Sequence, residues 1–313
     1  MKLAFVFPGQ GSQSVGMLNA LNAVYPAVAA TYAEASDVLG YDLWQLVSQG
    51  PEAQLNQTQR TQPAMLVAGV AVWRVWQQLA GPQPVVLAGH SLGEYTALTC
   101  ADAITFTDAV KLVADRGRYM QEAVPSGQGG MAAILGLEDQ AVRDVCAQAA
   151  EGEVLEAVNY NSPGQVVVAG TAAAVERVVV QALAAGAKRA LILPVSVPSH
   201  CSLMHPAALR MAERLAQVDF RAPRIPVIHN ACVQGETDPQ AIRAALVRQI
   251  EAPVRWVETI QKIAADSVHK LVECGPGKVL TGLNKRIDKT TQTLPVFDPE
   301  SLAQALAALG ADA

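Results

Sequence analysis

The sequence predicts an α/β protein with a large domain, built on a mostly parallel sheet, and a small inserted subdomain. Short apolar runs that suit buried strands alternate with helical patterns, which is typical of a parallel sheet covered on both faces. The pattern changes at the glycine-rich stretch Pro125–Gly130 and then follows the order strand, helix, strand, strand, helix, strand. We therefore expect residues 126–196 to form a ferredoxin-like subdomain, and residues 1–125 and 197–313 to form one discontinuous large domain.

The first part of the large domain contains two predicted buried strands and several helices. The run at Thr61–Leu79 is apolar on most faces, so it predicts a helix inside the core. A later helix is amphipathic, with Thr107 or Asp108 near its N-cap. The main elements expected here are strands at Leu3–Phe7 and Val85–Ala88 and helices at Thr61–Leu79, after Ser91 and at Thr107–Gln121.

The subdomain and the second part of the large domain follow the same kind of pattern. In the subdomain we expect strands at Met131–Leu137, Val154–Val158, Val166–Ala169 and Arg189–Val195, with helices at Glu138–Ala150 and Thr171–Ala185. Beyond it we expect helices at His205–Gln217, Pro239–Ile250 and Val254–Ala265, strands at Ile225–Asn230 and Lys270–Cys274, and one further helix after the turn at 275–278.

Composition limits the classes of function. The net charge of the 313 residues is −5 and no Lys/Arg-rich run occurs, which argues against a nucleic-acid partner. The five cysteines are scattered without a CxxC pair, which favours free thiols in a reducing cytosol. The N-terminus lacks the features of a signal peptide, and no apolar run approaches the roughly 18 residues of a membrane span. We expect a cytoplasmic protein that does not bind membranes.

The stretch Gly89-His90-Ser91-Leu92-Gly93 carries the strongest local signal for function. It follows a predicted strand and precedes a helix, as in the nucleophile elbow of α/β-hydrolase-like domains. Such a turn exposes the serine hydroxyl at a helix N-terminus, where unpaired N–H groups can stabilise an oxyanion. A GxSxG pattern can also arise by chance in a turn, but the flanking strand and helix favour a nucleophile at Ser91.

A serine nucleophile needs a base, and histidine is the usual one. His200 follows the last strand of the subdomain, where the chain re-enters the large domain, and domain junctions often hold sites. His205 is the nearest competitor, with capping or packing of the next helix as its alternative role. The side chain of His90 should diverge from Ser91 around the turn. No Asp or Glu between Ser91 and His200 lies in a pattern that identifies it as the residue that orients the histidine. Either a carboxylate that the pattern does not reveal or a neutral carbonyl must therefore hold the imidazole.

Two glycine-containing loops suggest nucleotide binding only superficially. The loop FPGQGSQ after the first strand lacks the third glycine of GxGxxG, and ECGPGKV lacks the Walker spacing. The first loop can instead donate a backbone N–H to an oxyanion, because it follows a parallel strand of the same sheet as the elbow. The second is best explained as a tight turn that opens a helix.

Several segments together resemble one enzyme family. The segments FVFPGQGSQSVGM, GHSLGEYTAL, RGRYMQ, NYNSPGQVVVAG, VPSHCSLM and ECGPGKVLTGL resemble, in this order, the malonyl-CoA:acyl carrier protein transacylases of bacterial fatty acid synthesis. The acyltransferase domains of polyketide synthases are also similar. The resemblance implies ping-pong transfer of malonyl from malonyl-CoA, through a malonyl-serine, to the phosphopantetheine thiol of acyl carrier protein. It implies no cofactor or metal of the enzyme's own, and a monomer.

The resemblance also implies roles for individual residues. Ser91 matches the nucleophile, and His200 matches its general base. Gln249 matches the residue whose backbone carbonyl orients that histidine. Gln10 and Leu92 match the two donors of the oxyanion hole through their backbone N–H groups.

Substrate and carrier binding are implied at basic side chains. Arg116 matches the arginine that pairs with the free carboxylate of malonyl, a contact that a planar guanidinium suits. Arg118 is its rival, but two residues apart on a helix they cannot both face the site. Lys285 and Arg286 are candidates for binding the acidic carrier, with a solvated helix face as the alternative. An esterase, a thioesterase and a silent carrier-binding subunit are the rival functions.

Overall fold

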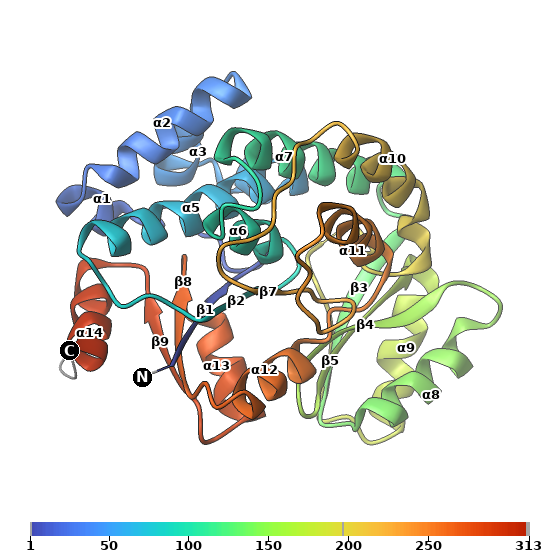
Figure 1. Cartoon of the computed structure of the whole chain (residues 1–313). Helices are drawn as coiled ribbons and strands as arrows, with labels where there is room; N and C mark the ends of the chain where they lie inside the picture. Colours follow the sequence, from blue (N-terminus) through green and yellow to red (C-terminus); the bar gives the residue numbers. More distant parts are fainter. Residues whose placement is uncertain (1, 196, 311–313) are drawn as a thin grey trace.

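A five-stranded parallel sheet forms the centre of the large domain in the computed structural model, which describes residues 2–195 and 197–310 (Figure 1). The strands lie in the order β7-β2-β1-β8-β9, and each neighbouring pair is parallel. They are β1 (Leu3–Phe7), β2 (Val86–Gly89), β7 (Val227–Ile228), β8 (Lys270–Cys274) and β9 (Gln292–Val296). The predicted α/β class with a mostly parallel sheet is confirmed.

Two strands at the edges of this sheet differ from the prediction. β7 has two residues rather than the expected run at Ile225–Asn230, because the chain turns back after it and the N–H of His229 donates to the carbonyl of Gln234. β9 was not predicted. It lies at the sheet edge, is mostly half-exposed and contains Pro295, so it lacks the apolar run of a buried strand.

Helices cover both faces of the sheet, as Figure 1 shows. On one face, Phe5 of β1 packs edge-on against Trp73 and Trp76, with ring centroids 5.1 and 5.2 Å apart. On the other face, Ala4 and Val6 share a buried cluster with two later helices, α12 and α13. The helices of the large domain are α1 (Asn19–Val24), α2 (Ala27–Leu39), α3 (Leu43–Gln49), α4 (Glu52–Leu55), α5 (Thr58–Gln78), α6 (Gly93–Cys100), α7 (Phe106–Ala123), α10 (His205–Leu215), α11 (Pro239–Glu251), α12 (Trp256–Ala265), α13 (Val279–Ile287) and α14 (Pro299–Gly310), with the 3₁₀ turn η1 (Ser202–Met204).

The start of α7 corrects the predicted cap. The helix begins at Phe106, and its N-cap is Thr105 rather than Thr107 or Asp108. The hydroxyl of Thr105 accepts a hydrogen bond from the N–H of Asp108 at 3.1 Å and donates one to the Asp108 carboxylate at 2.7 Å. The hydroxyl thereby satisfies one unpaired N–H of the first turn, so the helix can start one residue earlier than expected.

The small sheet is antiparallel and has the strand order β4-β5-β3-β6 in the described part of the chain. With helices between its first and last pairs of strands, this is the ferredoxin-like arrangement that the sequence predicts. Its elements are β3 (Gly129–Leu135), α8 (Asp139–Ala150), β4 (Leu155–Ser162), β5 (Gln165–Thr171), α9 (Ala172–Ala184) and β6 (Arg189–Ile192). They fall within the predicted range 126–196, whose last residue lies outside the described residues, as do residues 1 and 313.

The two faces of the small sheet have different partners. One face packs against α8 and α9 in a cluster of its own. The other face buries Met131, Val158 and Val167 together with Cys201, which follows the subdomain in sequence. The N–H of Tyr160 also donates to the carbonyl of Val254 in the large domain. The subdomain therefore supports the segment around residues 200–203 from one side.

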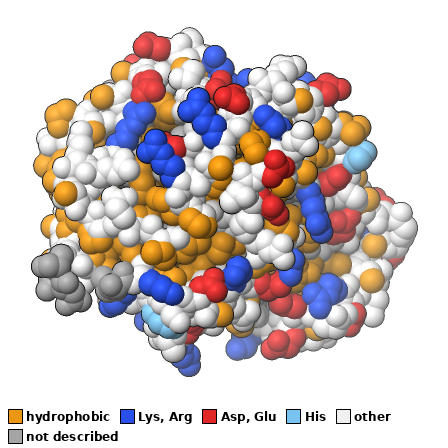
Figure 2. All heavy atoms as spheres, viewed as in Figure 1, with side chains coloured by type: hydrophobic (Ala, Val, Ile, Leu, Met, Phe, Trp, Pro, Cys, Tyr) orange, Lys and Arg blue, Asp and Glu red, His pale blue; other side chains and the backbone are white. Residues whose placement is uncertain are grey.

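The surface gives little further indication of a partner. On the face in Figure 2, basic and acidic side chains are interspersed among hydrophobic and neutral ones. Within residues 2–195 and 197–310, no helix is both long and apolar enough to cross a membrane.

Candidate active site

Ser91 lies in a sharp turn between β2 and α6, at the carboxyl end of the central strands. Its φ of 52° is in the left-handed region, which non-glycine residues seldom adopt. A Cβ atom on Gly89 would lie 1.9 Å from the carbonyl group of Gly93, and one on Gly93 would lie 2.1 Å from the carbonyl oxygen of Phe7. Both glycines are therefore required for the chain to turn this tightly beside β1.

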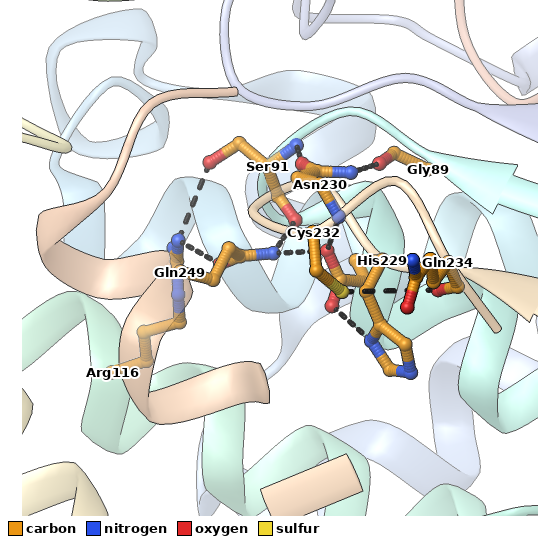
Figure 3. A network of polar contacts seen from close by, with 9 residues as sticks. Gly89, Ser91, Arg116, His229, Asn230, Cys232, Gln234 and Gln249 are labelled. Carbon is orange, nitrogen blue, oxygen red and sulfur yellow. Dashed lines mark hydrogen bonds and ion pairs between the residues drawn. The ribbon is translucent and has the colours of Figure 1, made fainter. Parts of the chain in front are cut away.

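Asn230 holds this turn from the neighbouring strand connection. Its Nδ2 donates to the carbonyl oxygen of Gly89 at 2.6 Å, and its Oδ1 accepts from the N–H of Ser91 at 2.7 Å (Figure 3). Asn230 is fully buried. Because both ends of its amide are used on the backbone around Ser91, the side chain offsets part of the strain of the turn.

His200 and Gln249 complete a short chain of hydrogen bonds from the serine. The Oγ of Ser91 lies 2.7 Å from Nε2 of His200. Nδ1 of His200 lies 2.7 Å from the main-chain oxygen of Gln249. A carbonyl oxygen can only accept, so Nδ1 carries the proton and Nε2 presents a lone pair to the serine hydroxyl. Of the two alternatives that the sequence left open, the structure has the neutral carbonyl.

The environment of His200 keeps its imidazole uncharged. Burial is the main cause that lowers the pKa of His200, and the positive charge of Arg116 lowers it further, to about 3. The side chain is nearly inaccessible, with 2% of the residue exposed. An uncharged imidazole at neutral pH can accept a proton from Ser91, which is the property that a general base needs.

The guanidinium of Arg116 is buried beside the serine. Its Nη2 lies 3.3 Å from Oγ of Ser91 and donates to Oε1 of Gln249 at 3.0 Å, while Nη1 donates to Oε1 of Gln62 at 2.9 Å. Only 1% of the residue is exposed, and no described carboxylate forms an ion pair with it. Burial lowers the pKa of Arg116, but an arginine starts so high that it stays charged. A buried cation without a direct ion-pair partner favours an anionic ligand.

A close helix contact explains how Arg116 reaches this position. A Cβ atom on the next residue, Gly117, would lie 2.7 Å from the main-chain oxygen of Thr58. The glycine lets α7 approach the start of α5, which brings Arg116 against Gln62. The ring of Tyr95 lies 5.4 Å from the guanidinium carbon and forms another wall.

A buried carboxylate that sequence reasoning missed lies behind these residues. Glu94 is fully buried in the first turn of α6. It accepts hydrogen bonds from Nδ1 of His229 at 2.7 Å, from the N–H of Asn230 at 2.9 Å and from Nε2 of Gln249 at 2.8 Å. Burial is the largest single influence and lowers the pKa of His229, but the charge and hydrogen bond of Glu94, together with the charge of Glu236, outweigh it and raise that pKa. The only available signal was the acid three residues after Ser91, one helical turn away.

The rival residues lie elsewhere. His205 is exposed at the start of α10, where Nδ1 contacts the carboxylate of Glu251. Arg118 is also exposed and pairs with Asp115. His90 points away from the serine, as predicted, and its Nε2 lies 2.7 Å from Oδ1 of Asn161. Of the histidines and arginines weighed against one another, His200 and Arg116 are the two that contact the hydroxyl of Ser91.

The proposed oxyanion donors lie on two segments beside the serine. Leu92 is the N-cap residue of α6 and is buried. Gln10 is exposed on the loop after β1. This loop touches the elbow, because a Cβ atom on Gly9 would lie 2.5 Å from the main-chain oxygen of His90. Both residues therefore lie on segments that adjoin the turn around Ser91.

The carrier-binding candidates lie in the last turn of α13. Lys285 is exposed. Arg286 is exposed too, but its guanidinium donates to Oγ of Ser162 at 3.2 Å and to Oε1 of Gln165 at 2.7 Å. These contacts link α13 to the end of β4 and the start of β5, and Asn161, also in β4, contacts His90.

Comparisons with known proteins identify chains that are similar over nearly the whole length. The sequence profile described as "Acyl transferase domain" matches residues 4–299. A malonyl CoA-acyl carrier protein transacylase of Salmonella typhimurium is 58% identical over 97% of this chain and 99% of its own length. The crystal structure of an acyl carrier protein S-malonyltransferase from Vibrio cholerae is 61% identical, with a TM-score of 0.95 over 97% of this chain and 99% of that one.

One solved structure is a complex. It contains a type II polyketide synthase acyl-carrier protein bound to its malonyl-transacylase, and it matches 98% of this chain and all of that chain at 54% identity and a TM-score of 0.97. The profile match and the fold show that the chain is an acyltransferase. Within that class, the chain belongs to the malonyl CoA-acyl carrier protein transacylase family.

Proposed function

We propose that this protein transfers the malonyl group of malonyl-CoA to the phosphopantetheine thiol of acyl carrier protein, through a malonyl ester on Ser91. The observation that carries the proposal is the buried guanidinium of Arg116 beside the serine hydroxyl, without an acidic partner among the described residues. A thioester with a free carboxylate at its far end satisfies both groups at once. The names of the relatives support the same substrates.

The first half-reaction would form the ester. Oγ of Ser91 attacks the thioester carbonyl carbon while Nε2 of His200 takes the hydroxyl proton. The main-chain N–H groups of Gln10 and Leu92 donate to the oxyanion of the tetrahedral intermediate. The carbon–sulfur bond then breaks, and His200 returns the proton to the departing thiolate of CoA. Gln249 stabilises the imidazolium through its carbonyl oxygen without taking its proton.

The second half-reaction reverses these steps with another thiol. His200 takes the proton of the carrier's phosphopantetheine thiol, and the sulfur attacks the ester carbonyl. The carbon–oxygen bond breaks, and the proton returns to Oγ of Ser91. Loss of one oxyanion donor of this kind costs about 10²–10³ in rate. Arg116 holds the carboxylate throughout, so the acyl group keeps one orientation for both attacks.

The remaining expectations belong to this proposal. Lys285 and Arg286 offer positive charge to the acidic carrier, and reversing their charge should weaken carrier binding more than malonyl-CoA binding. The large domain is proposed to span residues 1–125 and 197–313, with residues 126–196 as the subdomain. We propose a cytoplasmic monomer without a metal or cofactor of its own, and sedimentation of the purified protein tests the oligomeric state.

An intact-mass experiment tests the mechanism. Incubation with malonyl-CoA alone should add one malonyl group to the wild-type protein, and peptide mapping should find it on Ser91. Addition of phosphopantetheinylated acyl carrier protein should remove the group and leave it on the carrier thiol. The variant Ser91→Ala should gain no mass. A wild-type protein that stays unmodified refutes the covalent step, and release of free malonate without carrier labelling indicates a thioesterase.

A further inference from the structure

Gln249 contacts both functional side chains that flank the serine, but through different atoms. Its main-chain oxygen accepts from Nδ1 of His200, and its side-chain Oε1 accepts from Nη2 of Arg116. Its side-chain Nε2 donates in the opposite direction, to the main-chain oxygen of Ser91 at 2.9 Å (Figure 3). The same nitrogen donates to Oε2 of Glu94 at 2.8 Å. The orientation of this one amide therefore affects how Arg116 is held.

The donors and acceptors around the amide allow only one orientation. A guanidinium has only donors, so Arg116 requires the oxygen end of Gln249. The carboxylate of Glu94 and the carbonyl of Ser91 have only accepting oxygens, so they require the nitrogen end. A flipped amide would put its oxygen against two oxygens and its NH₂ against the guanidinium. Because Glu94, Arg116 and Gln249 are all buried, water could not relieve these contacts at low cost.

The carboxylate of Glu94 is held in place by other hydrogen bonds, so it can determine the orientation of the Gln249 amide. Besides Gln249, it accepts from Nδ1 of His229 and from the N–H of Asn230, and all three donors are buried. It touches neither the hydroxyl of Ser91 nor the guanidinium of Arg116 in the described hydrogen bonds and ion pairs. The amide of Gln249 separates its negative charge from the positive charge of Arg116.

We propose that Glu94 is a positioning residue for malonyl recognition. It orients the side-chain amide of Gln249, and the amide oxygen then holds Nη2 of Arg116 beside Ser91. The carboxylate of Glu94 acts through the Gln249 amide and forms no direct ion pair with Arg116. The guanidinium can therefore form an ion pair with the carboxylate of the substrate. This proposal rests on the proposed malonyl transfer and adds a residue that the family resemblance did not assign.

The test compares malonyl-CoA with acetyl-CoA as donors. Acetyl lacks the carboxylate, so the ratio of their kcat/KM values reports on Arg116, whereas a loss of folded protein lowers both values equally. Glu94→Leu should reduce this ratio on the order of tenfold, the effect of losing one well-placed hydrogen bond to a charged group. An unchanged ratio in soluble Glu94→Leu overturns the proposal.

A conservative variant separates orientation from charge. In Glu94→Gln, the amide oxygen can still accept from Asn230 and Gln249, and its NH₂ can face His229 if that ring moves its proton to Nε2, which has no partner in the described structure. We expect Glu94→Gln to keep the malonyl-to-acetyl ratio within about threefold of the wild-type value. A loss as large as in Glu94→Leu would mean that charge, not orientation, matters, and would overturn the proposal.

The variant Gln249→Leu tests the contact between the Gln249 amide and Arg116 directly. It removes the amide and leaves the main-chain carbonyl for His200. Its malonyl-to-acetyl ratio should fall as in Glu94→Leu. The ratio of the double variant should fall no further, because both substitutions interrupt the same chain of contacts from Glu94 to Arg116. Losses that add up in the double variant contradict the proposal. If Glu94→Leu is insoluble, Gln249→Leu decides alone, and an unchanged ratio there overturns it.

Glu273 provides a matched control. This glutamate is also fully buried and also accepts three hydrogen bonds, from the N–H groups of Leu280 and Thr281 and from the hydroxyl of Thr281. Its contacts lead to α13 rather than to Gln249. Glu273→Leu should lower the melting temperature without changing the malonyl-to-acetyl ratio, and a changed ratio would contradict the assignment to Glu94. If the wild-type protein forms no malonyl ester, the proposed function fails instead, independently of these variants.

Discussion

Replacement of Arg116 by alanine should remove most of the preference for malonyl while sparing transfer of an uncharged acyl group. In the structure, the guanidinium is buried and its Nε has no hydrogen-bond partner within residues 2–195 and 197–310, while Nη2 reaches the serine hydroxyl. A bound carboxylate can therefore accept from this group in a site from which water is largely excluded. Hydrogen bonds between charged groups in such a site are shorter and stronger than neutral ones.

The size of the effect follows from the number of bonds lost. Each hydrogen bond to a charged group contributes about 1.5–3 kcal/mol, and a carboxylate can accept two from one guanidinium. Arg116→Ala opens space for water, which recovers part of this free energy for the malonyl carboxylate. We therefore expect a loss of about 3–4 kcal/mol in transition-state stabilisation, or about 10²–10³ in kcat/KM for malonyl-CoA.

The assay measures thiol-dependent transfer from malonyl-CoA and acetyl-CoA to the carrier under identical conditions. With acetyl-CoA the value should change by less than about tenfold, since no carboxylate contact is lost. Arg118→Ala is the matched control, because Arg118 lies on the same helix but is exposed and pairs with Asp115. It should leave both substrates unchanged. Equal losses for malonyl and acetyl in Arg116→Ala would refute the role of Arg116 in carboxylate binding.

Three further predictions follow from the same contacts. His200→Ala should lower the rate of serine acylation by at least about 10³-fold, whereas His205→Ala should keep most of the rate. Rapid quenching followed by intact-mass measurement compares the two rates, and the reverse result would make His205 the base. Asn230→Ala leaves the N–H of Ser91 and the carbonyl of Gly89 unpaired, so the free energy of unfolding should fall by about 2–4 kcal/mol, measured by urea denaturation; a variant as stable as wild type contradicts this role. The pKa of His200 is lowered to about 3 in the folded protein, against about 6.5 when unfolded, so the unfolded chain binds a proton first on acidification. The contribution of His200 to stability is complete above about pH 6.5 and is lost as the pH falls toward 3; urea midpoints for wild type and His200→Ala should converge over this range, and a constant difference between them would be inconsistent with the lowered pKa.

Elements with a buried apolar run were predictable from the sequence, and elements fixed by their neighbours were not. β1 and β8 have the predicted bounds because every residue of β1 and nearly every residue of β8 is buried. β9 was missed because it pairs only with β8 and stays half-exposed, so its sequence has no strand pattern. The α7 cap was misplaced by two residues because a threonine outside the apolar pattern supplies the hydroxyl.

The residues of the site also differ in whether the sequence could predict them. Ser91 could be found because the elbow is local, with its glycines and its strand next to each other in sequence. Glu94 and Asn230 could not, since their roles depend on contacts with residues 155 and 139 positions away, respectively. No spacing rule links such positions, and an acid or an amide there is equally compatible with a solvated surface. Only the fold brings them to the serine.

The neutral partner of His200 is consistent with the charge balance of the whole site. A carboxylate facing Nδ1 of His200 would raise the pKa of the imidazole, and it would also stand close to the buried guanidinium that Gln249 contacts. The anionic end of a substrate would then compete with a resident anion. With a carbonyl in that place, Arg116 has no direct ion-pair partner among the described residues until a carboxylate binds. Its charge is also one cause of the low pKa of His200, so a bound malonyl group should raise that pKa and make the base stronger when the thioester is present.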